Sequence, residues 1–275
     1  MKGCTEMIFD THAHYDDEAF EEDLEDVMEQ LKGCVKGIIN SGASLKSSRS
    51  TIELAHRYDF VYGSVGVHPD DAGELEYEQG GRIVRNEAAY EELKRLALDP
   101  GTVAVGEIGL DYHWDRYSHE IQKAAFCGQW ELADSLGLPV VIHSRDAAAD
   151  TLELIKSRFE KNAGKPLRAV MHCYSYSPEQ ALEYLKMGLY FGIGGVLTFK
   201  NAKKLLASVE LIPMDRILLE TDTPYLAPEP HRGSRNNSSY LSFVAQKLAE
   251  IKGITPEEVY EITCMNAQRL FDRIH

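Results

Sequence analysis

The chain has 275 residues, of which 44% are hydrophobic and 27% are charged, a composition typical of a soluble globular protein. Its formal net charge of −15 argues against a protein that coats nucleic acid through a broad basic surface. The charge does not exclude an enzyme that takes a phosphodiester end into a metal-lined pocket, because bound cations reverse the local electrostatic field.

Short apolar segments alternate with amphipathic segments along the chain. The apolar segments are rich in Val, Ile, Leu and aromatic residues, as in strands that are covered on both faces. The predicted strands are residues 6–12, 35–41, 61–67, 102–108, 138–143, 168–173, 189–195 and 217–222. The predicted helices are residues 18–32, 44–58, 86–98, 118–136, 147–162, 177–187, 201–210 and 237–252, and a last one that starts at Thr255 and ends near residue 271. We expect the stretch from Gly73 to Gly81 to be a surface loop.

Eight strands that alternate with helices fit either a closed (β/α)8 barrel or a large open doubly wound sheet. No G-x-G-x-x-G follows the first predicted strand, which disfavours a dinucleotide-binding sheet. The sequence contains no linker, internal repeat or low-complexity segment. We therefore expect residues 1–275 to form one α/β domain.

Cysteine usage and hydropathy bear on the compartment. The five cysteines are widely spaced and odd in number, with no C-x-x-C motif, which favours a reducing compartment without a disulfide framework. Asp10 interrupts the first apolar run, so no signal-peptide core is evident, and no stretch is long enough to span a membrane. These features predict a cytoplasmic protein with no membrane partner and no obligate protein partner.

Side chains that bind metals occur at the ends of the predicted strands. His12 and His14 end the first strand and point the same way, because alternate residues of a strand share a face. The later strands end in or near His68, Glu107, His143, His172, Glu220 and Asp222. In a barrel these carboxyl ends share one rim, where the catalytic residues of this architecture lie.

Any one of these residues, taken alone, is better explained as a core histidine, a helix cap or a polar group at the start of a loop than as a metal ligand. Together, the histidines with Glu107 and Asp222 have the composition of a two-metal hydrolytic centre, since neutral imidazole and carboxylate suit borderline divalent ions. Glu220, two residues before Asp222, is better explained as a partner of a ligand than as a reacting group. Cys173 should point to the opposite face from His172 and serve packing.

Cationic and aromatic side chains are expected on the same rim. Arginine forks suit phosphate oxygens, although ordinary surface charge explains each cation equally well. The candidate substrate-binding cations are Arg145, Lys200, Arg232 and Arg235. The rings of Tyr174, Tyr176 and Tyr225 could stack a base, and a core role is equally open.

Ordered motifs along the chain resemble those of the TatD family of metal-dependent deoxyribonucleases, within the amidohydrolase-like TIM-barrel superfamily. The matching segments are F-D-T-H-A-H (9–14), G-V-H-P (66–69), V-G-E-I-G-L-D-Y (105–112), V-I-H-S-R-D-A (141–147), M-H-C-Y-S (171–175), G-G-V-L-T-F-K (194–200), L-L-E-T-D-T-P-Y-L-A-P (218–228) and R-G-S-R-N (232–236). The segment N-A-Q-R-L-F (266–271) also resembles the last helix of the family.

The resemblance implies two divalent metal ions, with Zn, Mn, Ni and Mg as the candidates. One ion would be bound by His12, His14 and Asp222, the other by His143 and His172, with Glu107 bridging the two. Asp222 would accept the proton of the attacking water, and His68 would contact the substrate phosphate or its leaving group.

The implied reaction is hydrolysis of phosphodiester bonds from the 3′ end of single-stranded DNA. The alternative enzyme is an amidohydrolase or lactonase that acts on a small anionic substrate with the same metal centre. A non-catalytic nucleic-acid-binding protein is disfavoured because it would not need a complete ligand set. Two departures from the family bear on the substrate: Tyr176 replaces a usual Gly, and the stretch from Ala72 to Arg85 is longer than usual.

Overall fold

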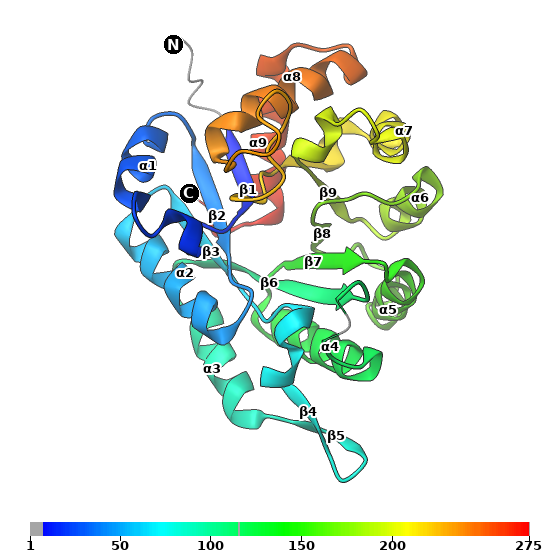
Figure 1. Ribbon diagram of the computed structural model, residues 1–275. Helices are drawn as coiled ribbons and strands as arrows, with labels where there is room; N and C mark the ends of the chain where they lie inside the picture. Colours follow the sequence, from blue (N-terminus) through cyan, green and yellow to red (C-terminus); the bar gives the residue numbers. More distant parts are fainter. Residues whose placement is uncertain (1–7, 115, 275) are drawn as a thin grey trace.

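The computed structural model describes residues 8–114 and 116–274, and its centre is an eight-stranded parallel sheet (Figure 1). Neighbouring strands follow the order β1-β2-β3-β6-β7-β8-β9-β10. The bounds are β1 Phe9–Ala13, β2 Gly37–Ser41, β3 Val61–Val65, β6 Thr102–Asp111, β7 Val140–Arg145, β8 Ala169–Met171, β9 Tyr190–Ile193 and β10 Ile217–Leu219. Residues 6 and 7 of the first predicted strand lie outside the described residues.

The two edges of this sheet meet. Ala13 forms a parallel bridge with Thr223, just beyond β10. The backbone N–H of Asp222 donates to the carbonyl of His12 at 2.9 Å, and the N–H of His14 donates to the carbonyl of Thr223 at 2.8 Å. The sheet is therefore a nearly closed barrel of the TIM type, which confirms the predicted fold class and excludes the open sheet.

Helices follow the strands and cover the outside of the barrel (Figure 1). Their bounds are α1 Leu24–Leu31, α2 Leu45–Arg57, α3 Glu87–Ala97, α4 His119–Leu136, α5 Ala148–Lys161, α6 Pro178–Lys186, α7 Lys203–Leu211, α8 Leu241–Lys252 and α9 Pro256–Leu270. A capping box between Thr255 and Glu258 starts α9, as the sequence predicts. The first predicted helix is shorter than expected, because residues 18–20 form a separate 3-10 turn.

The expectation of a loop at Gly73 to Gly81 is wrong. A 3-10 helix, Pro69–Glu74, leads into an antiparallel hairpin of β4, Glu76–Gln79, and β5, Arg82–Arg85, which projects from the barrel in Figure 1. Gly80 and Gly81 join the strands with φ values of 61° and 76°. Two consecutive residues with positive φ define the tight turn that matches the twist of a hairpin, and Gly-Gly adopts it without steric cost.

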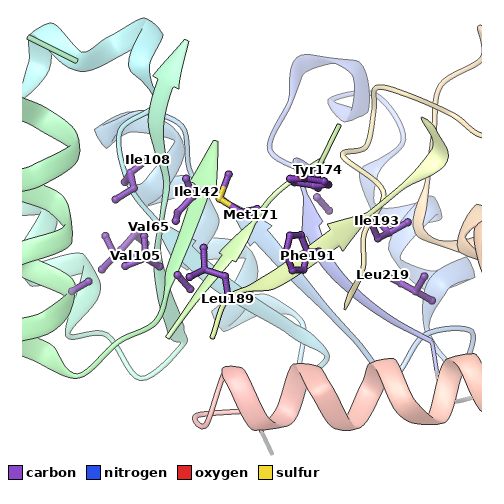
Figure 2. Packing of buried hydrophobic residues seen from close by; sticks show 14 of the residues in the cluster. Val65, Val105, Ile108, Ile142, Met171, Tyr174, Leu189, Phe191, Ile193 and Leu219 are labelled. Carbon is purple, nitrogen blue, oxygen red and sulfur yellow. The ribbon is translucent and has the colours of Figure 1, made fainter. Parts of the chain in front are cut away.

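Hydrophobic packing fixes the strands whose carboxyl ends carry the predicted metal ligands. Side chains from successive strands, among them Val65, Val105, Ile142, Phe191 and Leu219, form a continuous core (Figure 2). A second cluster joins strand residues such as Phe9 and Val103 to Leu270 and Phe271 at the end of α9. The last helix thus covers the end of the barrel where the strands begin, and the carboxyl ends are left open on the other side.

Cys127, Cys173 and Cys264 are free, in line with the predicted lack of a disulfide framework, whereas Cys34 is disulfide-bonded. Cys4 lies outside the described residues. Among the described residues, no helix is both long enough and apolar enough to cross a bilayer.

Candidate metal centre

His12 and His14 at the end of β1 direct their Nε2 atoms to one point. The two Nε2 atoms lie 3.1 Å apart. Ser41 at the end of β2 orients both rings: its hydroxyl lies 3.2 Å from His12 Nδ1, and its carbonyl accepts from His14 Nδ1 at 2.8 Å. Because Nδ1 of His14 donates to this carbonyl, Nε2 is the nitrogen that has a free electron pair for a ligand when the ring is neutral.

Glu107 of β6 is buried at the centre of the histidines and turns one carboxylate oxygen to each side. Its Oε2 lies 3.5 Å from His12 Nε2 and 3.8 Å from His14 Nε2. Its Oε1 lies 2.8 Å from His143 Nδ1 and 3.7 Å from His172 Nε2. A carboxylate between two pairs of imidazoles has the arrangement of a ligand that two cations share.

Asp222 follows β10, and its carboxylate lies beside His12 and His14, the residues predicted to bind the first metal ion with it. Its Oδ1 lies 3.5 Å from His14 Nε2, 3.6 Å from His172 Nε2 and 3.9 Å from His12 Nε2. The residue has φ of 59°, a left-handed conformation that Asp tolerates better than most residues. His12, His14 and Asp222 offer ligand atoms that all lie within 4.8 Å of one another, as the sequence predicts.

The second predicted group is assembled differently. His143 joins Glu107 and His68 within 4.8 Å, whereas His172 joins Glu107 and His12. The rings of His143 and His172 are 6.4 Å apart, and His172 instead stacks on His12 at 3.5 Å. Glu107 is thus the residue that connects the two histidines assigned to a second ion.

The prediction that Cys173 points away from the candidate ligands is wrong. Its thiol lies within the 4.8 Å group that includes His172 and Asp222. A φ of 45° at Cys173 breaks the strand alternation on which the prediction depended. Burial raises the pKa of the thiol well above its usual value, so in the metal-free protein it is protonated.

Two carboxylates hold the outer nitrogens of the histidines. His143 Nε2 lies 3.0 Å from Asp111 Oδ2, and His172 Nδ1 lies 3.0 Å from Glu220 Oε1. Glu220 has the supporting position that the sequence predicts, whereas Asp111 was missed. Asp111 is four residues beyond Glu107 on β6, and this even spacing within one strand is the signal that could have indicated it.

Burial and neighbouring carboxylates act in opposite directions on the histidines. Burial lowers the pKa of His14, but Asp222 and Glu107 outweigh it and raise the pKa to about 9. Burial also lowers the pKa of His143 and of His172, but carboxylates outweigh it: Asp111 and Glu107 raise the pKa of His143 to about 10, and Glu220 and Glu107 raise that of His172 to about 9. Burial would raise the pKa of Glu107, yet the surrounding histidines hold it well below the usual value. Protons therefore balance the carboxylates in the metal-free protein.

The donor set fits divalent metal ions. Ring nitrogens converge on one place, Nε2 from His12, His14 and His172 and Nδ1 from His143, and an oxygen faces the other nitrogen of each ring. With ionised carboxylates beside them, this is the arrangement that zinc-type ions use. Burial lowers the pKa of His68 to about 3, so this histidine is neutral near the centre. Its Nδ1 accepts from the backbone N–H of Asp70 at 3.1 Å, which leaves Nε2 as the protonated nitrogen.

These pKa values predict how the metal-free protein responds to pH. The pKa of His14 and that of His143 lie above the usual 6.5, at about 9 and about 10. The stability that they contribute is present in full below pH 6.5 and is lost as the pH rises through these values. We expect the melting temperature of chelator-treated protein to fall between pH 7 and pH 10.

Added Zn²⁺ should oppose this fall, because neutral imidazoles are the ligands and metal affinity rises with pH. Thermal unfolding between pH 7 and pH 10, with and without Zn²⁺, measures both effects. In a His14→Asn control, the melting temperature of the metal-free protein should fall less steeply with pH. A melting temperature that stays constant or rises without metal would contradict the proton-balanced cluster.

Five of the candidate ligands line a cleft of about 720 Å³. Beyond His14, Glu107, His143, His172 and Asp222, its lining includes His68, Trp114, Arg116, Arg145 and Tyr225. His68 and Arg145 are therefore where the sequence predicts them. Trp114 and Arg116, from the loop after β6, are cleft residues that the sequence did not indicate.

Tyr174 was predicted to contact the substrate, but its ring is buried. Its ring is 2% exposed and packs 5.0 Å from Phe191 in the core (Figure 2), and its hydroxyl donates to the carbonyl of Ser177 at 2.6 Å. An enclosed ring cannot stack a base, so the predicted substrate contact is wrong. Tyr176 pairs through its hydroxyl with Ser144 at 2.9 Å and does not line the cleft.

Three predicted substrate-binding cations do not line the cleft: Lys200, Arg232 and Arg235. Arg235 forms a two-pronged ion pair with Asp23 at 2.6 and 2.8 Å and covers the ring of Phe20. Arg232 lies over the ring of Phe199, 4.4 Å from its centroid. The structure thus leaves Arg145 as the predicted cation that reaches the cleft.

Comparison with known proteins places these features in a family. Residues 9–272 match the family model described as TatD related DNase. The chain is 42% identical over 266 residues to the uncharacterized metal-dependent hydrolase YabD of Bacillus subtilis (strain 168), with 96% of this chain and 99% of that protein covered. It is 34% identical over 271 residues to a protein of Cronobacter sakazakii named 3'-5' ssDNA/RNA exonuclease TatD, with 96% and 97% covered.

A solved structure agrees with these relatives. YJJV, a TatD homolog from Escherichia coli K12, has a TM-score of 0.85 to this chain and 26% sequence identity, with 97% of this chain and 98% of that chain covered. The matches extend over every strand that carries a candidate ligand.

Proposed function

Since this chain belongs to the TatD related DNase family and is a metal-dependent hydrolase, we propose that it removes nucleotides from the 3′ end of single-stranded DNA. The observation that carries the proposal is the position of Glu107, with one oxygen toward His12 and His14 and the other toward His143 and His172. This arrangement supports two divalent ions, and two-metal sites serve phosphodiester hydrolysis.

The residues divide between two ions. His12, His14 and Asp222 would hold the first, His143 and His172 the second, and Glu107 would contact both. When bound, such ions polarise the phosphodiester and lower the pKa of water. Zn, Mn, Ni and Mg remain the candidates, with the histidine-rich set favouring the first three.

Asp222 is the residue that we assign to proton transfer. Burial would raise its pKa, but the hydrogen bond from His14 and the charge of His172 hold it below its usual value. Its carboxylate is therefore ionised at neutral pH and can accept the proton of the attacking water. His68, neutral and at the cleft, presents Nε2–H to the phosphate or to the leaving oxygen.

Charge and shape favour the end of a single strand. The chain carries a net charge of −15, which repels a long nucleic acid, so binding should depend on the proposed metal ions and on the cations of the cleft. Arg116 and Arg145 are the arginines in its lining. A single-stranded end also avoids the free-energy cost of unpairing a terminal base. The exonuclease name of the Cronobacter relative supports both the substrate and the 3′ direction.

End-labelled oligonucleotides test this proposal. We expect a 5′-labelled single strand to give a ladder that shortens from the 3′ end, faster than a blunt duplex of the same sequence, after a metal series is added to chelator-treated protein. Salt dependence should be shallow, because few phosphates are neutralised.

A ladder from the 5′ end or cuts within circular DNA would contradict the proposed direction. If no nucleic acid is cleaved with any of these metals, hydrolysis of a small anionic amide or lactone becomes the function to test.

A further inference from the structure

The two tryptophans of the chain are in opposite environments. Trp130 is 3% exposed and packs against Phe126, with ring centroids 5.4 Å apart. Trp114 is 58% exposed and lines the cleft that contains the candidate metal ligands. The indole of Trp114 contacts the edge of the His113 ring, with centroids 4.9 Å apart, and the guanidinium of Arg145 lies over it. More than half of its surface is still exposed and can contact a flat ligand.

The backbone of Trp114 is tied to the candidate metal centre. Asp111 Oδ1 accepts from the backbone N–H of His113 at 2.8 Å and from that of Trp114 at 3.4 Å. The other oxygen of Asp111 lies 3.0 Å from His143 Nε2. Gln122 of α4 secures Asp111 in turn, since it pairs with both the N–H and the carbonyl of Asp111 at 2.9 Å. The carboxylate of Asp111 thus contacts the candidate ligand His143 and also the backbone at the start of the loop that carries Trp114.

Positive charge accompanies Trp114. The guanidinium of Arg145 lies 5.6 Å from the ring centroid, and Arg145 forms no ion pair with any residue that the structure describes. Arg116, two residues after Trp114, also lines the cleft, and its contact with Asp70 is a loose one at 3.9 Å. In a chain with a net charge of −15, this is a local site for an anion.

The other exposed ring of the cleft has the opposite surroundings. Tyr225 donates its hydroxyl to Asp17 at 2.7 Å, and Asp16 and Asp17 both line the cleft beside it. Carboxylates next to a ring repel the phosphates on either side of a stacked base. The Trp114 side of the cleft is therefore the side that combines an exposed indole with Arg145, which is outside every ion pair that the structure describes.

We propose that Trp114 stacks a base next to the scissile phosphate, while Arg145 pairs with a phosphate of the same strand. The inference rests on the nuclease function proposed above and names the residue that selects a nucleic acid with unstacked bases as the substrate. Base stacking on an aromatic side chain tolerates every base, so the preference is for single strands and not for a sequence.

Tryptophan emission tests the contact without turnover. We would use an Asp222→Asn protein with Zn²⁺ and an unlabelled single-stranded oligonucleotide, with acrylamide as a neutral quencher. Because Trp130 is buried, acrylamide quenching reports on Trp114. We expect the oligonucleotide to quench the emission and to protect the remainder from acrylamide. The same strand with abasic sites at its 3′ end should bind more weakly and give no protection.

Variants separate stacking from structure. In otherwise wild-type protein, Trp114→Ala should raise KM for single strands about tenfold with little change in kcat, in line with the loss of one stacked base. Trp114→Phe, which keeps a ring, should restore KM to within a few-fold of wild type. Arg145→Ala should raise KM for intact and abasic strands alike, whereas Arg232→Ala, outside the cleft lining, should change neither.

Binding and cleavage assays distinguish a wrong stacking role for Trp114 from a wrong nuclease function. If a labelled oligonucleotide binds and is cleaved while Trp114 keeps its emission and Trp114→Ala keeps its KM, the stacking role is overturned and the nuclease function stands. If no nucleic acid binds or is cleaved, both are overturned.

Discussion

An Asp222→Asn protein is expected to hydrolyse phosphodiesters at least about a hundredfold more slowly than the wild type, since general-base catalysis contributes about 10²–10⁴-fold. Asn keeps the shape of the side chain but cannot accept the proton. The carboxylate of Asp222 lies 3.5 Å from His14 and 3.6 Å from His172, so it faces both groups of candidate ligands. Single-turnover rates on an end-labelled single strand measure the loss.

Metal content must be measured in the same samples, because Asp222 is also a candidate ligand. Asp272→Asn is the matched control, since Asp272 is exposed and pairs with Arg168 at 2.8 Å outside the cleft. Near-normal turnover by an Asp222→Asn protein with full metal content would contradict the assignment and direct attention to Glu220.

The Glu107→Gln substitution is expected to have a comparably large effect for a different reason. Glu107 is 4% exposed and lies between the two pairs of histidines, so its charge would serve both of the proposed ion sites. Loss of a partner that merely orients a ligand already costs about 10–100-fold in affinity or activity, so loss of a shared ligand should cost at least about a hundredfold in rate. The metal content should fall from two ions per chain to one or none.

Glu76→Gln is the matched control for this experiment. Glu76 is also a buried glutamate, at 6% exposure, and it accepts from the hydroxyl of Tyr90 at 3.1 Å in the hairpin region, away from the candidate ligands. This variant should keep both ions and the wild-type rate. A Glu107→Gln protein that retains two tightly bound ions would contradict the shared role.

The sequence predicts the barrel and its polar end because both depend on local patterns. Apolar runs of strand length alternate with amphipathic helices, and parallel strands in a barrel bring their carboxyl ends to one rim. Residues far apart in the chain, such as His12 and Asp222, are thereby predicted to meet before any contact is known. The resemblance to the family then assigns their roles.

The wrong predictions for Cys173 and Tyr174 arise because both residues lie beyond the end of a strand, where side chains no longer alternate between the two faces. β8 stops at Met171, and the left-handed φ of Cys173 reverses the direction of the side chains that follow. The thiol of Cys173 consequently turns toward His172, and Tyr174 enters the core. A period of two predicts neither, because it holds only within a strand.

The substrate-binding residues are harder to predict because they lie on loops. The pairing of Arg235 with Asp23 joins positions 212 residues apart, and no local pattern in either segment indicates it. Trp114 and Arg116 reach the cleft because Asp111 and Gln122 hold the start of their loop. The hairpin of β4 and β5 could have been predicted, since Gly80-Gly81 lies between two short segments of strand character.

The position and number of the metal ions in crystals of the wild type and of Glu107→Gln would show directly whether Glu107 is shared by two ions. For the wild type soaked in Mn²⁺ or Zn²⁺, we expect two anomalous peaks about 4 Å apart, a spacing typical of two-metal sites, with one oxygen of Glu107 near each peak. For Glu107→Gln we expect one peak or none. A single ion in the wild type, or two ions that Glu107 does not touch, would contradict the shared role.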